Sequence, residues 1–310
     1  MSAYHQPVML RETLKWLAPV PGGTYVDGTL GGGGHSEAIL REGGIVWGID
    51  RDENAIVAAS TRLSGYPGFR ALRGNFHDMR ALLAGQGVLA VNGILLDLGV
   101  SSYQLDTPER GFSYHADAPL DMRMDQSQGF TAEELVNTWP VADIARVLRD
   151  YGEESWAARV AEIIVEHREQ SPLRTTGDLV RAVDAAIPRK VRDRDKGHSA
   201  QRTFQALRIA VNDELGPLEQ ALEDAVAVLA PLGRLCVITF HSLEDRVVKR
   251  AFRRLENPCT CPPQMPVCVC GKKPVIRLPA RGATKPSEAE IDENPRARSA
   301  KLRVAERRPE

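Results

Sequence analysis

The chain has no long hydrophobic run, and this excludes an α-helical membrane protein. None of its apolar stretches approaches the roughly 20 residues that are needed to span a bilayer. Its first residues, Met1 to Gln6, lack the basic and apolar regions of a signal peptide. We therefore expect a protein that does not bind a membrane and that resides in the cytoplasm.

The chain also has no excess of charge of either sign. It contains 40 Lys and Arg residues and 41 Asp and Glu residues, with a net charge of −1. Overall composition therefore gives no sign of nucleic-acid binding. Residues 189–208 are nevertheless basic, with seven Lys and Arg residues against two Asp residues. Such a segment either binds phosphate groups or forms an ordinary solvated face, and composition leaves both interpretations open.

Cysteine is scarce, and four of the five cysteines are confined to one short segment. Cys259 and Cys261 form one Cys-x-Cys pair, and Cys268 and Cys270 form a second. Disulfides are not expected in a reducing cytoplasm. Four thiolates at this spacing are candidate ligands for a structural zinc ion, although Cys-x-x-Cys pairs are the usual donors. The alternative is a flexible loop that carries free thiols.

What the chain does have is a regular alternation of apolar strands and helices over its first hundred residues, which predicts a parallel sheet. After Leu98 the alternation stops, helical spacing follows, and strand character returns only at Leu235–Phe240. We therefore predict a sheet domain made of residues 1–105 and 206–310, with an inserted helical domain at 106–205. Residues Asn257–Pro295 are rich in Pro, Lys and Cys and are expected to form an exposed loop. The strands are predicted at Thr24–Asp27, Ile45–Asp50, Phe69–Arg73, Gly93–Leu98, Leu235–Phe240 and Ala300–Ala305.

The glycine-rich turn at residues 27–35, Asp-Gly-Thr-Leu-Gly-Gly-Gly-Gly-His, lies between the first predicted strand and a helix. Such a turn lets backbone amides approach a ligand closely. Ser36 stands where a dinucleotide-binding motif would have its third glycine, and no Gly-x-x-x-x-Gly-Lys phosphate loop is present. Asp27 is poorly suited to a pyrophosphate but well suited to an ammonium group. These features favour S-adenosylmethionine, with Asp50 at the end of the second strand holding the ribose hydroxyls.

Longer motifs extend over almost the whole chain and resemble the bacterial 16S ribosomal RNA (cytosine-N4)-methyltransferase family of the MraW/RsmH type. The motifs that carry the resemblance are His5–Leu10, Val26–Ser36, Gly48–Asp52, Gly93–Ser102, Gln104–Asp106, Arg110–Ser113, Pro119–Asp125, Tyr151–Glu154, Arg202–Ile209, Phe240–Arg246 and Asn294–Ala300. One segment departs from the family pattern, because His198-Ser199-Ala200-Gln201 stands where the family usually has His-Pro-Ala-Thr.

The resemblance implies an α/β protein with a class I, Rossmann-like methyltransferase sheet and an inserted all-helical domain that recognises RNA. It implies methylation of the exocyclic N4 of a cytidine in the decoding region of 16S rRNA, with this RNA bound as part of the small ribosomal subunit. The implied cofactor is S-adenosylmethionine, and the family's cofactor positions fall on Gly33, Gly34, His35, Asp50, Phe76, Asp97 and Gln104. A homodimer stays open.

The group that orients the N4 amine is not specified by any motif. Asp97, or a backbone carbonyl of the turn that follows it, is one candidate, and His241 at the next strand end is the second. In the inserted domain, the candidates for phosphate contacts are Arg189, Lys190, Arg192, Arg194 and Lys196. The alternative function is an RNA-binding ribosome assembly factor that uses the fold without catalysis.

Overall fold

A computed structural model describes residues 7–127, 129–193, 198–262, 264–265, 267–280 and 282–309. The chain divides into two compact units, the first formed by Met1–Gly99 and Leu215–Glu310 and the second by Val100–Glu214. His5 and Gln6 of the first motif, and Arg194 and Lys196 of the basic segment, lie outside the described residues.

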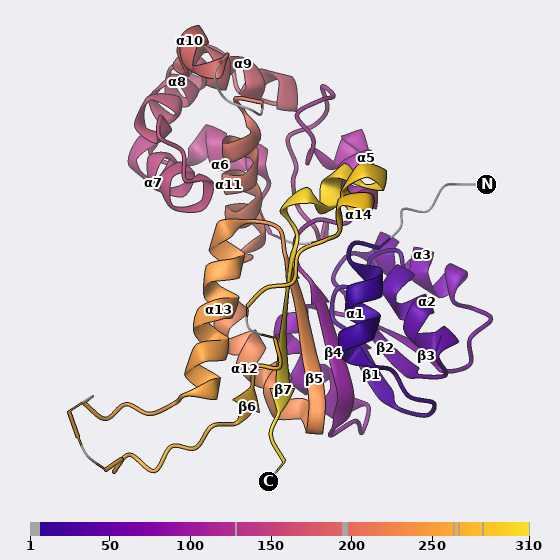
Figure 1. Ribbon diagram of the computed structural model, residues 1–310. Coiled ribbons are helices and arrows are strands. Elements are labelled where there is room, and N and C mark those ends of the chain that lie inside the picture. Colours follow the sequence, from indigo (N-terminus) through magenta and orange to yellow (C-terminus); the bar gives the residue numbers. More distant parts are fainter. Residues whose placement is uncertain are drawn as a thin grey trace. The chain divides into compact units, whose positions relative to one another are not determined.

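The described residues of the first unit form a seven-stranded sheet with the order β3-β2-β1-β4-β5-β7-β6 (Figure 1). Strands β1 to β5 run parallel, and β7 pairs antiparallel with both β5 and β6. The strands are β1 (Thr24–Asp27), β2 (Ile45–Asp50), β3 (Phe69–Arg73), β4 (Val91–Asp97), β5 (Leu229–Thr239), β6 (Ile276–Arg277) and β7 (Lys301–Arg307).

Helices cover both faces of this sheet. Leu95 and Leu96 belong to different buried clusters, because successive strand residues point to opposite faces. One cluster includes Val248 and Phe252 from α13, and the other includes Leu17 from α1. The helices of this unit are α1 (Leu10–Leu17), α2 (Gly34–Arg41), α3 (Glu53–Arg62), α4 (Met79–Gly85), α12 (Leu218–Val228), α13 (Ser242–Glu256) and α14 (Glu288–Glu293), with short 3-10 helices η1 (Phe76–Asp78) and η3 (Pro295–Ser299).

The second unit is helical, and an isolated bridge joins Pro119 to Thr175. It has its own core, in which Leu135, Leu148 and Leu207 are fully buried. Thr131 and Thr175 cap two of its helices through reciprocal capping boxes. Its helices are α5 (Ser102–Asp106), η2 (Pro108–Arg110), α6 (Ala132–Thr138), α7 (Val141–Gly152), α8 (Ala157–Gln170), α9 (Thr176–Ala186), α10 (Arg189–Arg192) and α11 (Gln201–Asn212).

The mixed α/β fold with a mainly parallel sheet is confirmed, and β1, β2 and β3 have the predicted bounds. The helical unit begins at Val100 and ends at Glu214, whereas the insertion was expected at 106–205. Among the described residues, none forms a helix long and apolar enough to cross a membrane.

The expectation of one exposed loop over Asn257–Pro295 was wrong in part. Strand β6 forms there because Ile276 is buried and pairs with Arg307 of β7. Helix α14 forms because the Ser287 side chain accepts a hydrogen bond from the backbone amide of Glu290 at its start. Helices α1 and α5 were also not predicted. Helix α5 has five residues and lies in a polar stretch without helical periodicity.

Candidate functional site

Strands β1 and β4 are neighbours in the sheet although β2 and β3 separate them in sequence. The strand order therefore reverses between β1 and β4, and ligands of open α/β sheets bind beyond the carboxyl ends of the strands at such a switch point. Strand β1 ends at Asp27 and β4 ends at Asp97. Thr29 ties the two ends together, because its Oγ1 accepts a hydrogen bond of 2.6 Å from the backbone amide of Asp97.

The glycine turn after β1 is held by hydrogen bonds that its backbone amides donate to residues of β2. The amide of Leu30 donates to the carbonyl of Ile49 at 3.0 Å, and the amide of Gly31 donates to Oδ2 of Asp50 at 2.8 Å. Gly33 has a φ of 75° and forms the N-cap of α2, a conformation that favours glycine. A Cβ on Gly34 would lie 2.5 Å from Cγ of Pro7, so this glycine also lets the N-terminal segment approach.

Asp27 is buried in this turn, with 1% of its surface exposed. Its Oδ2 accepts a hydrogen bond of 2.7 Å from the hydroxyl of Ser36, and its Oδ1 accepts one of 3.3 Å from the amide of Thr29. Burial nevertheless raises the pKa of Asp27 to about 6, since these hydrogen bonds offset only part of the desolvation. Ser36, which departs from the dinucleotide-binding motif, thus orients an acidic side chain.

Asp97 is largely buried as well and is surrounded by negative charge. Burial raises its pKa well above the usual value, and the charges of Asp27 and Glu244 raise it further. Within the described part of the chain, Oδ1 of Asp97 is buried without a hydrogen-bond partner. An acceptor atom of this kind is costly unless a ligand supplies a donor or a positive charge.

His35 lies beside Asp97, with 3.9 Å between its Nδ1 and Oδ2 of the carboxyl group. Its Nε2 lies 3.0 Å from the backbone carbonyl of Val8, which can only accept a hydrogen bond. Burial lowers the pKa of His35 to about 4, so the ring is neutral at pH 7. His35 therefore anchors the N-terminal segment and does not neutralise Asp97.

The end of β2 presents a second polar group. Asp50 accepts hydrogen bonds from the amides of Gly31 and Asp52, at 2.8 and 2.9 Å, and burial raises its pKa. After β3, Asn75 caps η1 and so positions Phe76, whose ring packs edge-on against His77 with 4.3 Å between centroids. A carboxylate thus lies at the end of β2, which is next to β1 in the sheet, and an aromatic ring follows β3, which is next to β2.

His241, the second catalytic candidate, is the N-cap of α13. Its Nδ1 accepts a hydrogen bond of 3.4 Å from the amide of Glu244, and its Nε2 lies 3.0 Å from Oε1 of the same residue. Oε2 of Glu244 in turn accepts a hydrogen bond of 2.9 Å from the amide of Phe240. His241 is thus engaged in ending β5 and starting α13.

Gln104 belongs to the second unit. It forms a capping box with Ser101, in which the Ser101 amide donates to Oε1 of Gln104 at 3.0 Å and the Gln104 amide donates to the Ser101 hydroxyl at 3.2 Å. The other predicted cofactor residues all lie in the first unit, where Asp27, His35, Asp50 and Asp97 are brought together by the contacts above.

Comparison with known proteins decides the family. The model of the MraW methylase family matches residues 2–308. The chain belongs to this family. It is 55% identical over 309 residues to a protein of Symbiobacterium thermophilum named ribosomal RNA small subunit methyltransferase H, covering 98% of this chain and 96% of the relative. A relative of the same name from Heliobacterium modesticaldum is 52% identical over 313 residues, with 99% of each chain covered.

Solved structures similar to this one include a putative rRNA methylase from Clostridium thermocellum, with a TM-score of 0.44, 11% identity and 99% of each chain covered. A putative methyltransferase from Streptococcus mutans in complex with SAH has a TM-score of 0.45 and 8% identity, with 98% of this chain and 99% of the other covered. Membership of the MraW family makes the chain an S-adenosylmethionine-dependent methyltransferase, as the resemblance implied.

Sequence reasoning missed the part that Glu244 and Ser36 play in this site. Glu244 is 2% exposed and adds negative charge near Asp97. Its position three residues after His241 is typical of a capping box, and this spacing was a usable signal. Ser36 gave no comparable signal, because its hydrogen bond to Asp27 depends on how the glycine turn folds back on β1.

Proposed function

We propose that this enzyme transfers the methyl group of S-adenosylmethionine to the exocyclic N4 of a cytidine in the decoding region of 16S rRNA, and that it does so in the cytoplasm. The names of the relatives support small-subunit rRNA as the substrate. The observation that carries the cofactor assignment is the buried carboxyl group of Asp27 in the glycine turn, which a hydrogen bond from the Asp97 amide to Thr29 joins to the end of β4. A buried group of this kind favours a cationic ligand.

S-adenosylmethionine carries an ammonium group and supplies a methyl group that its sulfonium has already activated. Asp27 would face the ammonium group, and Asp97 would lie near the methionine part of the cofactor. Asp50 would accept hydrogen bonds from the ribose hydroxyls, as acidic residues at this strand end do in nucleotide-binding sheets. Phe76 would pack on the adenine ring. Gly33 and Gly34 would allow close approach of the backbone, and His35 completes the proposed set in this unit. Gln104, in the other unit, stays a prediction from the family resemblance.

Between the two candidates for the N4-orienting group, we favour Asp97. The cytosine N4 lone pair is delocalised into the ring, so an acceptor on its N–H would assist attack, and a base must eventually take the proton. Oδ1 of Asp97 is free to accept among the described residues, whereas His241 uses its Nδ1 to cap α13 by accepting from the amide of Glu244. A bound cation would lower the pKa of Asp97 and keep it ionised for this role.

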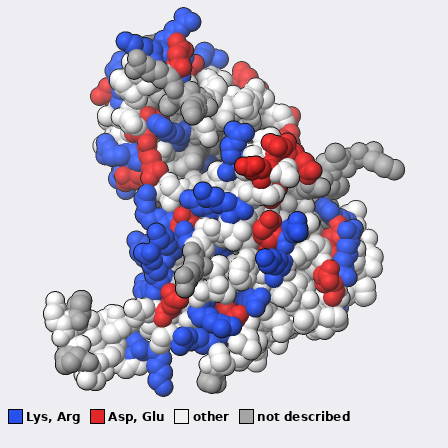
Figure 2. All heavy atoms as spheres, in the orientation of Figure 1, with Lys and Arg blue, Asp and Glu red and all other residues white. Residues whose placement is uncertain are grey.

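The helical unit is proposed to recognise the RNA. Helix α10 carries Arg189, Lys190 and Arg192, and Figure 2 shows basic side chains gathered over it at the top of the picture. The side chain of Arg189 is 87% exposed, and Arg192 pairs with Asp184 at 3.0 Å. Exposed guanidinium groups suit phosphate contacts that fix orientation without reading sequence. Ser199, in the segment that departs from the family, donates a hydrogen bond of 2.6 Å to Asp184 and so ties this region to α9.

The test is methyl transfer from labelled S-adenosylmethionine to 16S rRNA, offered both as free RNA and as the small subunit. Digestion to nucleosides should then recover the label in N4-methylcytidine. Label in another nucleoside would contradict the N4 assignment. Binding of small-subunit RNA without any label would instead support the alternative of an assembly factor that uses the fold without catalysis. Asp27→Asn is the variant to compare with the unchanged enzyme. It removes one buried carboxylate from the proposed cofactor site and leaves α10, the proposed RNA-binding helix, unchanged.

A further inference from the structure

Residues 257–275 form a loop between α13 and β6 that has no core of its own among its described residues. The loop leaves the rest of the unit where its two ends meet, since the amide of Val275 donates a hydrogen bond to the carbonyl of Leu255. Figure 1 shows it extending away from the sheet. None of its described residues is buried, and the side chains of Val267 and Val269 are about 70% exposed, at 69% and 71%. Apolar packing therefore does not hold its conformation.

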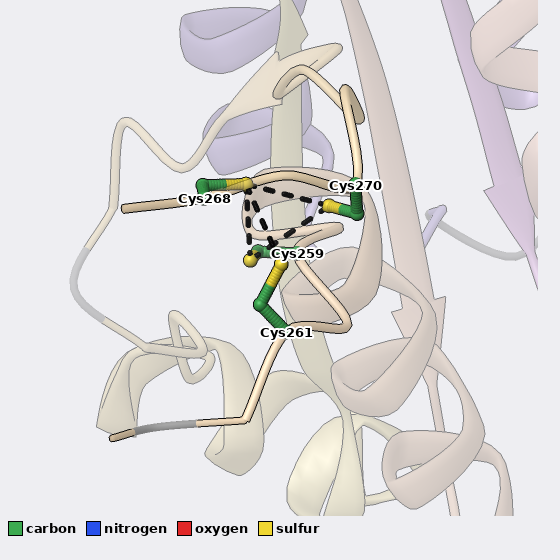
Figure 3. Close-up of side chains that lie close together, drawn as sticks. All are labelled: Cys259, Cys261, Cys268 and Cys270. Carbon is green, nitrogen blue, oxygen red and sulfur yellow. Dashed lines mark hydrogen bonds between the residues drawn. The ribbon is translucent and has the colours of Figure 1, made fainter. Parts of the chain in front are cut away.

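Four cysteine side chains nevertheless converge in this loop (Figure 3). The Sγ atoms of Cys259, Cys261, Cys268 and Cys270 all lie within 4.8 Å of one another. Cys268 lies 3.5 Å from Cys259, 3.9 Å from Cys261 and 3.4 Å from Cys270, and Cys270 lies 3.9 Å from Cys259, each measured between Sγ atoms. All four are free, so no disulfide brings them together.

These separations match those of a metal-bound tetrahedron. With Zn–S bonds of about 2.3 Å, the sulfur atoms of a tetrahedral site lie about 3.8 Å apart. The four Sγ–Sγ distances above, from 3.4 to 3.9 Å, are close to this value. The amide of Val269 also points to Sγ of Cys261, at 3.4 Å. Hydrogen bonds from backbone groups to ligand atoms are typical of the surroundings of a metal site.

We propose that Cys259, Cys261, Cys268 and Cys270 bind one structural Zn²⁺ ion, and that this ion fixes the conformation of the 257–275 loop. All four positions are filled by protein thiolates, so the site has no open coordination position and is not catalytic. Binding replaces four S–H bonds with four Zn–S bonds and releases the protons to solvent. Lys272 and Lys273, which closely follow Cys270, offset part of the negative charge of such a centre.

The site is separate from the strand ends where methyl transfer is proposed, and its test needs neither cofactor nor RNA. The full-length protein is purified under reducing conditions and its metal content is measured. We expect one zinc per chain. Replacement of all four ligands by serine should abolish zinc binding, whereas Cys236→Ala, which changes the buried cysteine of β5, should leave the stoichiometry at one. Zinc that persists in the fourfold variant would overturn the proposal.

Cobalt supplies a second measurement that does not depend on a variant. Metal-free protein titrated with Co²⁺ should show thiolate charge-transfer bands and the visible bands of tetrahedral cobalt, saturating at one equivalent. The same protein should be cut by trypsin within 257–275 about tenfold faster without metal than with zinc, because the loop then lacks the bonds that fix it. Reduced protein that binds neither Zn²⁺ nor Co²⁺ would overturn the proposal, as would equal cleavage rates with and without metal.

Discussion

Nδ1 of His35 lies 3.9 Å from Oδ2 of Asp97, yet the two side chains do not form an ion pair. The ring nitrogen on the other side, Nε2, donates its proton to the carbonyl of Val8, and burial lowers the pKa of His35 to about 4. At pH 7 the imidazole is therefore neutral and presents a lone pair, not a charge, to the carboxyl group. The negative charge at the strand ends is left for a ligand to balance.

This arrangement predicts that cofactor affinity rises with pH. Without ligand, burial holds the pKa of Asp27 at about 6, and a bound cation should lower it by favouring the ionised form. Binding therefore releases a proton below pH 6, and the dissociation constant should fall by about tenfold from pH 5 to pH 7.5 and then level off. Calorimetry in buffers of different ionisation enthalpy measures both the affinity and the released proton.

Asp27→Asn is the control for this pH dependence. The asparagine can still accept the hydrogen bond from Ser36 but cannot ionise, so the rise in affinity should be reduced and binding should be weaker at pH 7.5. Asp97 and Asp50, whose pKa values are also raised, can contribute a remaining slope. A dissociation constant of the unchanged enzyme that is independent of pH would contradict this account of the site.

Asp97→Asn tests whether this residue orients the N4 amine. We expect turnover to fall by about a hundredfold or more and the affinity for S-adenosylmethionine to fall by less than about tenfold, since Asp27 still faces the ammonium group and loss of a positioned acceptor affects mainly the chemical step. Single-turnover methylation and cofactor titration separate the two quantities. A large loss of cofactor affinity would show instead that Asp97 only holds the cofactor. His241→Asn, which keeps a side chain able to cap α13, should leave turnover within about tenfold.

Gly34→Ala should destabilise the protein through the N-terminal segment. The added Cβ would lie 2.5 Å from Cγ of Pro7, and a proline ring cannot move aside easily. We expect the free energy of unfolding to fall by about 1–3 kcal/mol, as is usual for overpacking. Thermal or urea unfolding measures this change, and adding Pro7→Ala should restore most of the stability. Gly85→Ala is the matched control, because a Cβ there meets nothing within 4 Å.

The basic face of α10 should contribute a salt-dependent part of RNA affinity. Replacing Arg189 and Lys190 together by alanine should weaken binding at low salt and reduce the slope of log K against log salt by about 0.7–0.9 for each phosphate that is no longer neutralised. Fluorescence anisotropy with a 16S rRNA fragment at increasing KCl checks this. Arg159→Ala removes a basic side chain elsewhere in the helical unit, in α8, and should leave the slope unchanged. An unaltered slope in the double variant would exclude α10 as a phosphate-binding face.

Glu306 also contributes to stability. It lies in the antiparallel strand β7, between β5 and β6 in the sheet. It is 2% exposed and pairs with Arg234 of β5 at 3.0 Å and with Arg277 of β6. Glu306→Ala should lower the free energy of unfolding by about 1–3 kcal/mol, because it removes charged hydrogen bonds from Arg234 and Arg277, whose side chains are 29% and 58% exposed. The exposed pair between Arg159 and Glu166 is the comparison, and Glu166→Ala should cost less than about 1 kcal/mol. Chemical denaturation distinguishes the two.

The sequence indicated the sheet and most of its helices because the spacing of apolar residues differs between strands and helices. It was less informative where pairing across the fold decides structure. Strand β6 has two residues, Ile276 and Arg277, and exists because β7 supplies hydrogen bonds and Ile276 is buried. Helix α1 begins at a left-handed Met9, which no pattern in the first residues marks.

For the site, residue types and their positions after strands predicted the chemistry but not the environment of each group. The sequence by itself determined that acidic side chains follow β1, β2 and β4 and that a glycine turn precedes α2, because these features depend on neighbours in the chain. Only the tertiary structure decided that Asp27, Asp97 and Glu244 lie close enough to raise a pKa, and that four sulfur atoms meet in one loop. The reason is physical: burial and charge proximity arise from contacts between segments far apart in sequence.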